Sequence, residues 1–267
     1  MRRTAAPAVI ALVRAVAAVA ACCLALASAA QAPADARRSG FDAMGPSTQA
    51  MQRDDTQNPG MLWVRDGEAL WATPAGEAQK SCAACHGAAA SGMRGVAARY
   101  PGFDAQLQRP VNLGQRINLC RERWQRAGPL RAESQELLGL ESFVAHQSRG
   151  MPIVAAAEPQ LAAFRERGER FYRQRFGQLD LACTQCHDDN AGKRLGSSVI
   201  PQGHPTGYPI YRLEWQGMGS LQRRLRGCLT GVRAEPFPFG ALEFVEIELY
   251  LAARAAGLPL ETPAVRP

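Results

Sequence analysis

The chain has 267 residues, of which 46% are hydrophobic and 21% are charged, and its formal charge is +7 at neutral pH. This length allows one large domain or two small ones. The basic excess is modest, so the overall charge does not indicate a nucleic-acid-binding protein.

The first 32 residues are predicted to be a secretory signal peptide. Arg2 and Arg3 precede a mostly apolar, alanine-rich stretch over residues 8–26, and small residues suited to cleavage follow at 27–32. Cys22 could instead mark a lipoprotein processing site, but the apolar stretch continues past it. Removing the segment discards three arginines and two cysteines, which lowers the charge to +4 and leaves six cysteines. No later run is long and apolar enough to span a bilayer.

Two pentapeptides of the form C-x-x-C-H carry the strongest signal, CAACH at residues 82–86 and CTQCH at residues 183–187. In such a motif the two thiols form thioethers to a haem and the histidine takes one axial position on the iron. We therefore predict two covalently bound haem c groups. Zinc is the alternative, but its ligands would have to converge in one tetrahedral site, whereas these motifs occur separately.

One further cysteine follows each motif, and we call Cys120 and Cys228 the two extra cysteines. Leu113 and Ile117 lie seven and three positions before Cys120, and leucines repeat this spacing before Cys228. This is the spacing of one helix face, so each extra cysteine is predicted to lie on the apolar stripe of a short helix.

The chain also repeats itself. The two haem motifs are 101 positions apart, as are the segments 67–71 and 168–172 that precede them, and the two extra cysteines are 108 apart. Such order predicts a duplicated unit. We expect an all-α fold of two tandem cytochrome c-type domains related by internal duplication, with no clear strand pattern. The predicted divisions are an N-terminal arm at 33–60, the first domain at 61–153 and the second at 154–267.

The sixth ligand of each iron has several candidates. Met151 lies in a Gly-Met-Pro loop that resembles an axial methionine loop, and His146 and His204 are also available. The repeat aligns Leu258 with Met151, whereas the extra cysteines match in both units. The pattern favours the extra cysteines, with Met151 or His146 as competitors on the first haem. A disulfide between the extra cysteines is a further alternative in an oxidising compartment.

Cys228 has the more reactive surroundings. Arg224 lies four positions earlier, on the same helix face, where it could bind an anion that approaches the sulfur. Gly227 precedes Cys228 where Leu119 precedes Cys120, which predicts a more open sulfur in the second unit. Two neighbouring arginines also favour the thiolate, although they are expected to pair with haem propionates or to face solvent.

Together these features resemble the diheme SoxA family, the larger subunits of SoxAX sulfur-oxidation cytochromes. The resemblance includes the segments GHPTGYP at 203–209 and SRGMP at 148–152 and covers nearly the whole mature chain. It implies a periplasmic L-cysteine S-thiosulfotransferase that couples thiosulfate oxidatively to a cysteine of the carrier SoxYZ. Electrons would pass through haem to the small partner cytochrome SoxX, and neither nucleic acid nor a membrane span is expected.

The resemblance also implies residue roles. Haem 1 would be held by Cys82, Cys85, His86 and Cys120, and haem 2 by Cys183, Cys186, His187 and Cys228, with histidine and the extra cysteine as each axial pair. Cys228 would carry a persulfide and act in catalysis, and Arg224 would bind thiosulfate. Arg254, on the final helix, is a weaker candidate for the anion pocket.

Two other functions remain open at this point. A diheme thiosulfate dehydrogenase would couple two thiosulfates to tetrathionate without a carrier protein. A passive diheme electron carrier would need no anion pocket, so replacement of Arg224 would leave its function nearly intact.

Overall fold

The computed structural model describes residues 35–267, and the predicted signal peptide at 1–32 lies outside them. Residues Arg37–Pro267 form one compact unit. Its helices are η1 (Gly40–Ala43), α2 (Pro46–Arg53), α3 (Met61–Ala72), α4 (Cys82–His86), α5 (Ala89–Gly92), η2 (Ala97–Arg99), α6 (Leu113–Cys120), η3 (Arg121–Gln125), α7 (Gln135–His146), η4 (Pro159–Leu161), α8 (Ala162–Arg173), α9 (Cys183–His187), α10 (Leu221–Gly231) and α11 (Leu242–Arg254). Its strands are β1 (Gly102–Asp104), β2 (Arg109–Val111), β3 (Arg194–Leu195), β4 (Ser198–Val199), β5 (Ile210–Arg212), β6 (Gly217–Gly219) and β7 (Ala264–Arg266). No helix in the described part is long and apolar enough to cross a membrane.

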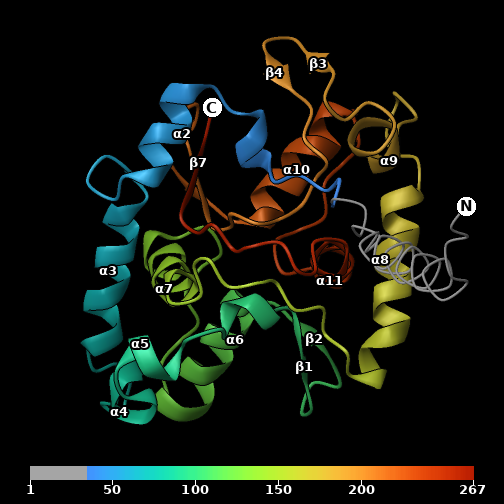
Figure 1. Ribbon diagram of the computed structural model, residues 1–267. Helices are drawn as coiled ribbons and strands as arrows, with labels where there is room; N and C mark the ends of the chain where they lie inside the picture. The colour runs from blue at the N-terminus through green and yellow to red at the C-terminus, as the bar shows by residue number, and fades with distance from the viewer. Residues whose placement is uncertain (1–34) are drawn as a thin grey trace, which may run out of the picture. The chain divides into compact units, whose positions relative to one another are not determined.

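The main helices and one hairpin occur in the same order in the first half, residues 61–153, and in the second half, residues 154–267. Helices α3, α4, α6 and α7 are followed in the same order by α8, α9, α10 and α11, and the hairpin β1–β2 corresponds to β5–β6. Helix α3 packs along α7, and α8 packs along α11. Figure 1 shows α3 and α8 on opposite sides, with α7 and α11 between them.

A glycine at each helix contact lets the paired helices approach closely. A Cβ atom on Gly67 of α3 would lie 2.0 Å from the backbone oxygen of Gly139 in α7. A Cβ atom on Gly168 of α8 would lie 2.0 Å from the backbone oxygen of Glu246 in α11. No side chain fits at such a distance, which explains why glycine begins both matched segments that precede the haem motifs.

Aromatic residues one turn later tie the same helices to the C-x-x-C-H turns. The indole nitrogen of Trp71 donates to the backbone oxygen of Gly87 at 3.2 Å. In the second half, the hydroxyl of Tyr172 donates to the carboxylate of Asp188 at 2.9 Å. Both aromatic rings are buried in the apolar core of their own half, so helix packing positions each motif.

The all-α expectation is correct for the helical framework but wrong about strands. Strand β1 pairs antiparallel with β2, and β5 lies between antiparallel β6 and parallel β7. These strands have two or three residues, too few for the alternation by which a strand is recognised. Part of the segment predicted as an arm forms helix α2, where the side-chain oxygen of Gln52 accepts from the backbone N–H of Val265 at 3.0 Å.

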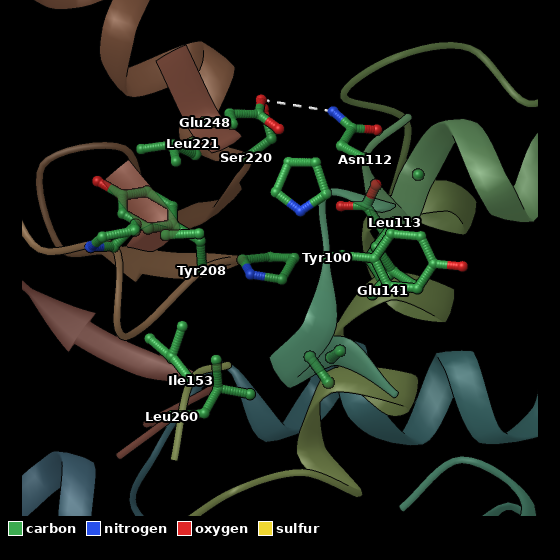
Figure 2. A pocket seen from close by; sticks show the side chains of 17 residues that line it. Tyr100, Asn112, Leu113, Glu141, Ile153, Tyr208, Ser220, Leu221, Glu248 and Leu260 are labelled. Carbon is green, nitrogen blue, oxygen red and sulfur yellow. Dashed lines mark hydrogen bonds between the residues drawn. The ribbon is translucent and has the colours of Figure 1, made fainter. Parts of the chain in front are cut away.

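A pocket of about 120 Å³ lies between the two halves and is lined from both. Figure 2 shows matched residues on opposite sides of it, among them Tyr100 and Tyr208, and Leu113 and Leu221, whereas the matched pair Ile153 and Leu260 lies side by side. Matched positions of the two halves therefore line one pocket.

Two carboxyl groups of the pocket are held away from water. A Cβ atom on Gly114 would lie 1.8 Å from an oxygen of Glu141, so glycine leaves room for that side chain. The side-chain amide of Asn112 donates to Glu248 at 3.4 Å. Burial raises the pKa of Glu141 to about 8, and the charges of Glu133 and Glu248 add to this rise. Burial also raises the pKa of Glu248 to about 7.

These raised pKa values predict that stability falls as the pH rises. The folded protein binds more protons than the unfolded chain between about pH 5 and pH 8, so the free energy of unfolding decreases across that window. We expect the melting temperature of the holo-protein to fall over this window and Glu141→Gln to flatten the fall. Glu235→Gln, at an exposed carboxylate, is the control. A Glu141→Gln profile as steep as that of the unaltered protein would contradict the assignment.

The glycine contact in the second half gives a stability prediction. Gly168→Ala should lower the free energy of unfolding by roughly 2 kcal/mol or more, because the added methyl group meets backbone that cannot yield without separating α8 from α11. Gly128→Ala is the matched control, since a Cβ there would meet no atom within 4 Å. Denaturant unfolding of both variants compares them, and equal midpoints would rule out the proposed tight contact.

Candidate functional site

Each C-x-x-C-H motif forms one short helix that begins at its first cysteine. Helix α4 is capped by Ser81, whose hydroxyl accepts from the backbone N–H of Ala84 at 3.1 Å. Helix α9 lacks such a cap, but the side-chain oxygen of Gln185 accepts from the backbone N–H of Ala182 at 2.8 Å. In a single turn the two cysteines and the histidine share one side, as attachment to one flat ring requires.

In the first half, Cys120 lies beside the first motif. It is the last residue of α6, which starts with a capping box between Asn112 and Gln115. The Cys120 thiol is close enough to those of Cys82 and Cys85 for their charges to interact. A cavity of about 190 Å³ adjoins Cys82, with leucine side chains from residues 70, 130 and 140 among its walls. Apolar walls beside paired thiols suit a covalently attached apolar macrocycle.

In the second half, Cys228 faces His187. The Nδ1 atom of His187 lies 2.7 Å from the backbone oxygen of Pro201, so this nitrogen carries the proton and the other is left for a ligand. The Cys228 thiol forms a hydrogen bond with the His187 ring. A Cβ atom on Gly203 would lie 3.2 Å from that ring, so the GHPTGYP segment packs directly against the histidine.

The three alternative axial ligands lie against other groups. A Cβ atom on Gly95 would lie 3.6 Å from the sulfur of Met151. His146 is near enough to Asp55 for their charges to interact. The Nδ1 atom of His204 is 2.8 Å from a backbone oxygen of the N-terminal segment. The structure brings each extra cysteine close to residues of its own motif.

Both extra cysteines are unbonded thiols, and both are partly buried. The alternative of a disulfide between them is therefore not realised. The sequence predicted that Gly227 would leave Cys228 more exposed than Cys120, but both thiols are partly buried. Charge separates the two sites more clearly than exposure does.

The charge around Cys120 is balanced, whereas that around Cys228 is positive. Arg116, the match of Arg224, lies 2.9 Å from the carboxylate of Asp104. Burial raises the pKa of the Cys120 thiol above its usual value, against the opposing charges of nearby arginines. Burial alone would also raise the pKa of Cys228, but its hydrogen bond with His187 and the charge of Arg224 outweigh burial and lower it.

The other arginines of α10 are directed at aromatic rings. The guanidinium of Arg223 lies 4.1 Å from the centre of the Trp215 ring, and that of Arg226 lies 4.7 Å from the centre of the Phe239 ring. Arg226 also donates to the backbone oxygen of Phe237. These cation–π contacts leave Arg224 as the arginine of this helix that acts on Cys228.

Arg254 lies beside the second motif, but its charge is already paired. It donates to Asp188 at 2.7 Å and stacks 4.6 Å from the centre of the Tyr172 ring. It therefore adds less positive charge than Arg224 to an anion pocket. The sequence reasoning did not identify Arg212, whose charge also lowers the pKa of Cys228. The offset of 108 positions would have found it, because it aligns Arg212 with Asp104.

A zinc site does not fit this arrangement. Among residues 35–267, no three His, Cys, Asp or Glu side chains converge to hold a metal ion. Two separate sets, each with paired thiols and a histidine on one turn and an extra cysteine close to that turn, fit haem c instead.

Comparisons with known proteins agree with this geometry. The family model of the SoxA/TsdA cytochrome c domain matches residues 66–153. The L-cysteine S-thiosulfotransferase subunit SoxA of Pseudaminobacter salicylatoxidans is 39% identical, over 88% of this chain and 82% of the relative. The same subunit of Paracoccus pantotrophus is 34% identical, over 85% of this chain and 78% of the relative.

A solved structure extends the similarity to the whole fold. The crystal structure of SoxXA from P. pantotrophus matches with a TM-score of 0.83 and 33% identity, over 86% of this chain and 87% of that chain. The cytochrome c domain means that haem c is bound covalently. The chain belongs to the SoxA family.

Proposed function

We propose that this protein is a periplasmic L-cysteine S-thiosulfotransferase that couples thiosulfate to a cysteine of a SoxYZ-type carrier. The observation that carries the proposal is the contact of the Cys228 thiol with His187 beside the guanidinium of Arg224. The names of the SoxA relatives support the reaction. The similarity to SoxXA supports a SoxX-type cytochrome as the partner.

We further propose two haem c groups, one in each half. Haem 1 would be attached through Cys82 and Cys85, and its iron would be bound by His86 and Cys120. Haem 2 would be attached through Cys183 and Cys186, and its iron would be bound by His187 and Cys228. Bound haem supplies a one-electron acceptor, so two electrons can leave in succession toward the partner cytochrome. The matching order of elements in both halves supports an origin by duplication, with domains at 61–153 and 154–267 after an N-terminal segment at 33–60.

The reaction forms one sulfur–sulfur bond and releases two electrons. Cys228 carries a persulfide, whose outer sulfur joins the terminal sulfur of thiosulfate while two electrons are withdrawn. The carrier thiolate then attacks the thiosulfate-derived sulfur, breaks the new bond and leaves the Cys228 persulfide as before. Overall, one carrier thiol and one thiosulfate give the carrier S-thiosulfonate, two electrons and one proton. Arg224 holds the anion and favours the anionic sulfur.

Intact mass and peptide mapping of the mature protein test the modifications. We expect two haems and one additional sulfur on the peptide that contains Cys228, whereas the peptide that contains Cys120 should lack that sulfur. A single haem would contradict the diheme assignment, and an unmodified Cys228 would contradict the persulfide.

Replacing the anion-binding residue tests catalysis. Arg224→Gln should lower kcat/KM for thiosulfate by roughly 10- to 100-fold, because a charge-assisted hydrogen bond is lost. Arg226→Gln, on the same helix, is the control and should have little effect. The assay follows carrier-dependent reduction of an external c-type cytochrome.

Two outcomes of that assay would refute the transferase. A passive electron carrier would tolerate Arg224→Gln, because outer-sphere electron transfer needs no anion pocket. A thiosulfate dehydrogenase would produce tetrathionate when the carrier protein is omitted.

A further inference from the structure

One buried carboxylate of the first half binds two arginines that flank Cys120 in the chain. Asp104, the last residue of β1, has a side chain that is 2% exposed, and one of its oxygens lies 2.9 Å from both Arg116 and Arg123. Arg123 also donates to the other oxygen at 3.1 Å, so its contact is bidentate. Such a pair is stronger and more directional than a single ionic contact. We call these three side chains the Asp104 clamp.

The clamp spans the two turns between which Cys120 lies. Arg116 is in α6, four positions before Cys120. Arg123 is three positions after Cys120, in η3, a π-helical turn of five residues that begins directly after the cysteine. Positions three and four apart lie on one side of a helix, so the carboxylate bridges the side of the helix that carries Cys120.

The turn that carries Arg123 also contacts the first haem motif. The side-chain amide of Gln125 in η3 donates to the backbone oxygen of Lys80 at 2.8 Å and to the sulfur of Cys82 at 3.9 Å. Two backbone hydrogen bonds between the loop before the motif and the end of this turn reinforce the contact. The clamp therefore connects β1 to the segment that lies against the first motif.

The second half has no equivalent of the clamp at the matched positions. Arg212 and Gly231 stand 108 positions after Asp104 and Arg123. Helix α10 continues through Cys228 to Gly231 without a separate π-helical turn. A contact needed only for the shared helical framework would be expected in both halves. The clamp therefore serves something that is particular to the first site.

The clamp also sets the charge beside Cys120. The hydrogen bond from Arg123 holds the pKa of Asp104 far below its usual range, so the carboxylate stays ionised. Two arginines and one carboxylate carry one net positive charge, whereas the arginines alone would carry two. Both arginine side chains are partly buried, so without the carboxylate they would repel each other across the Cys120 turn.

We propose that Asp104 is a positioning residue of the first haem site, which holds Arg116 and Arg123 together so that Cys120 is kept as an iron ligand beside a single net positive charge. This inference rests on the proposed role of Cys120 as an axial ligand of haem 1 and deepens it. The clamp adds no redox step, because it acts through position and charge alone.

Spectroelectrochemical titration of the full mature holo-protein tests this role. Asp104→Asn keeps Oδ1, which accepts from two backbone N–H groups of the next turn at 3.0 and 2.9 Å, but it replaces Oδ2 with a donor that cannot bind the arginines. It should lower the ratio of ferric to ferrous haem 1 at a fixed applied potential by roughly 10-fold, because an unpaired cation favours the added electron. Haem 2 should not change. Glu122→Gln, at an exposed carboxylate of η3, is the matched control and should change neither haem.

A charge-compensating variant separates this role from a purely structural one. Asp104→Asn combined with Arg123→Gln restores one net positive charge and should recover most of the ratio that Asp104→Asn loses. Electron paramagnetic resonance of ferric haem 1 should show part of the thiolate signature lost in Asp104→Asn and regained in the combined variant. Arg123→Gln alone should shift the ratio in the opposite direction. It leaves the carboxylate paired with Arg116, so it covers the case in which Asp104→Asn folds poorly.

The possible outcomes are distinct. Unchanged ratios in both Asp104→Asn and Arg123→Gln would overturn the role of the clamp. A combined variant that shifts further than Asp104→Asn would also overturn it, because the clamp would then be a packing contact only. Cys120→Ser identifies the signal of haem 1, since it removes the proposed thiolate ligand. If neither haem responds to Cys120→Ser, the proposed ligand assignment itself is refuted.

Discussion

The close packing of α8 against α11 is the contact on which the second site depends. At Gly168 the backbones approach too closely for any side chain. This approach brings Tyr172 of α8 and Arg254 of α11 to the same carboxylate, that of Asp188. Because Asp188 directly follows His187, two long helices set the position of the motif turn, which is too short to hold itself in place. The equivalent contact in the first half uses Gly67.

The two halves share a similar order of elements but differ in the charged groups around their extra cysteines. Strands β1 and β5 present their last residue at the same register, yet one is Asp104 and the other is Arg212. Packing tolerates this exchange because the position lies at the end of a short hairpin, where a long side chain can reach the chain terminus. The charges differ, since Asp104 forms an ion pair with Arg116, whereas no carboxylate of residues 35–267 forms an ion pair with Arg224. A similar backbone arrangement with different charges is a physical way to give two thiols different reactivity.

The pocket between the two halves brings two carboxyl groups, one from each half, to the same cavity. Matched residues line the same pocket there, among them Glu141 and Glu248. Gly114 gives room to one carboxyl group, and Asn112 from the first half donates to the other. Burial raises the pKa of Glu141 to about 8 and that of Glu248 to about 7, so near neutral pH Glu141 is mostly protonated and Glu248 is partly protonated. Backbone hydrogen bonds, such as that from Gly150 to Leu260, also join the two halves.

The sequence alone predicted the haem attachment motifs, the repeat, and the pairing of each extra cysteine with its own motif, because these predictions depend on local spacing along the chain. It also placed Arg224 on the face of Cys228. It did not reveal the short strands, helix α2, the carboxyl pair or Arg212. Those features depend on contacts between segments distant in the chain, such as Gln52 with Val265. Only the tertiary structure decided which charges meet at each sulfur, because electrostatic interactions follow distance in space and not separation in sequence.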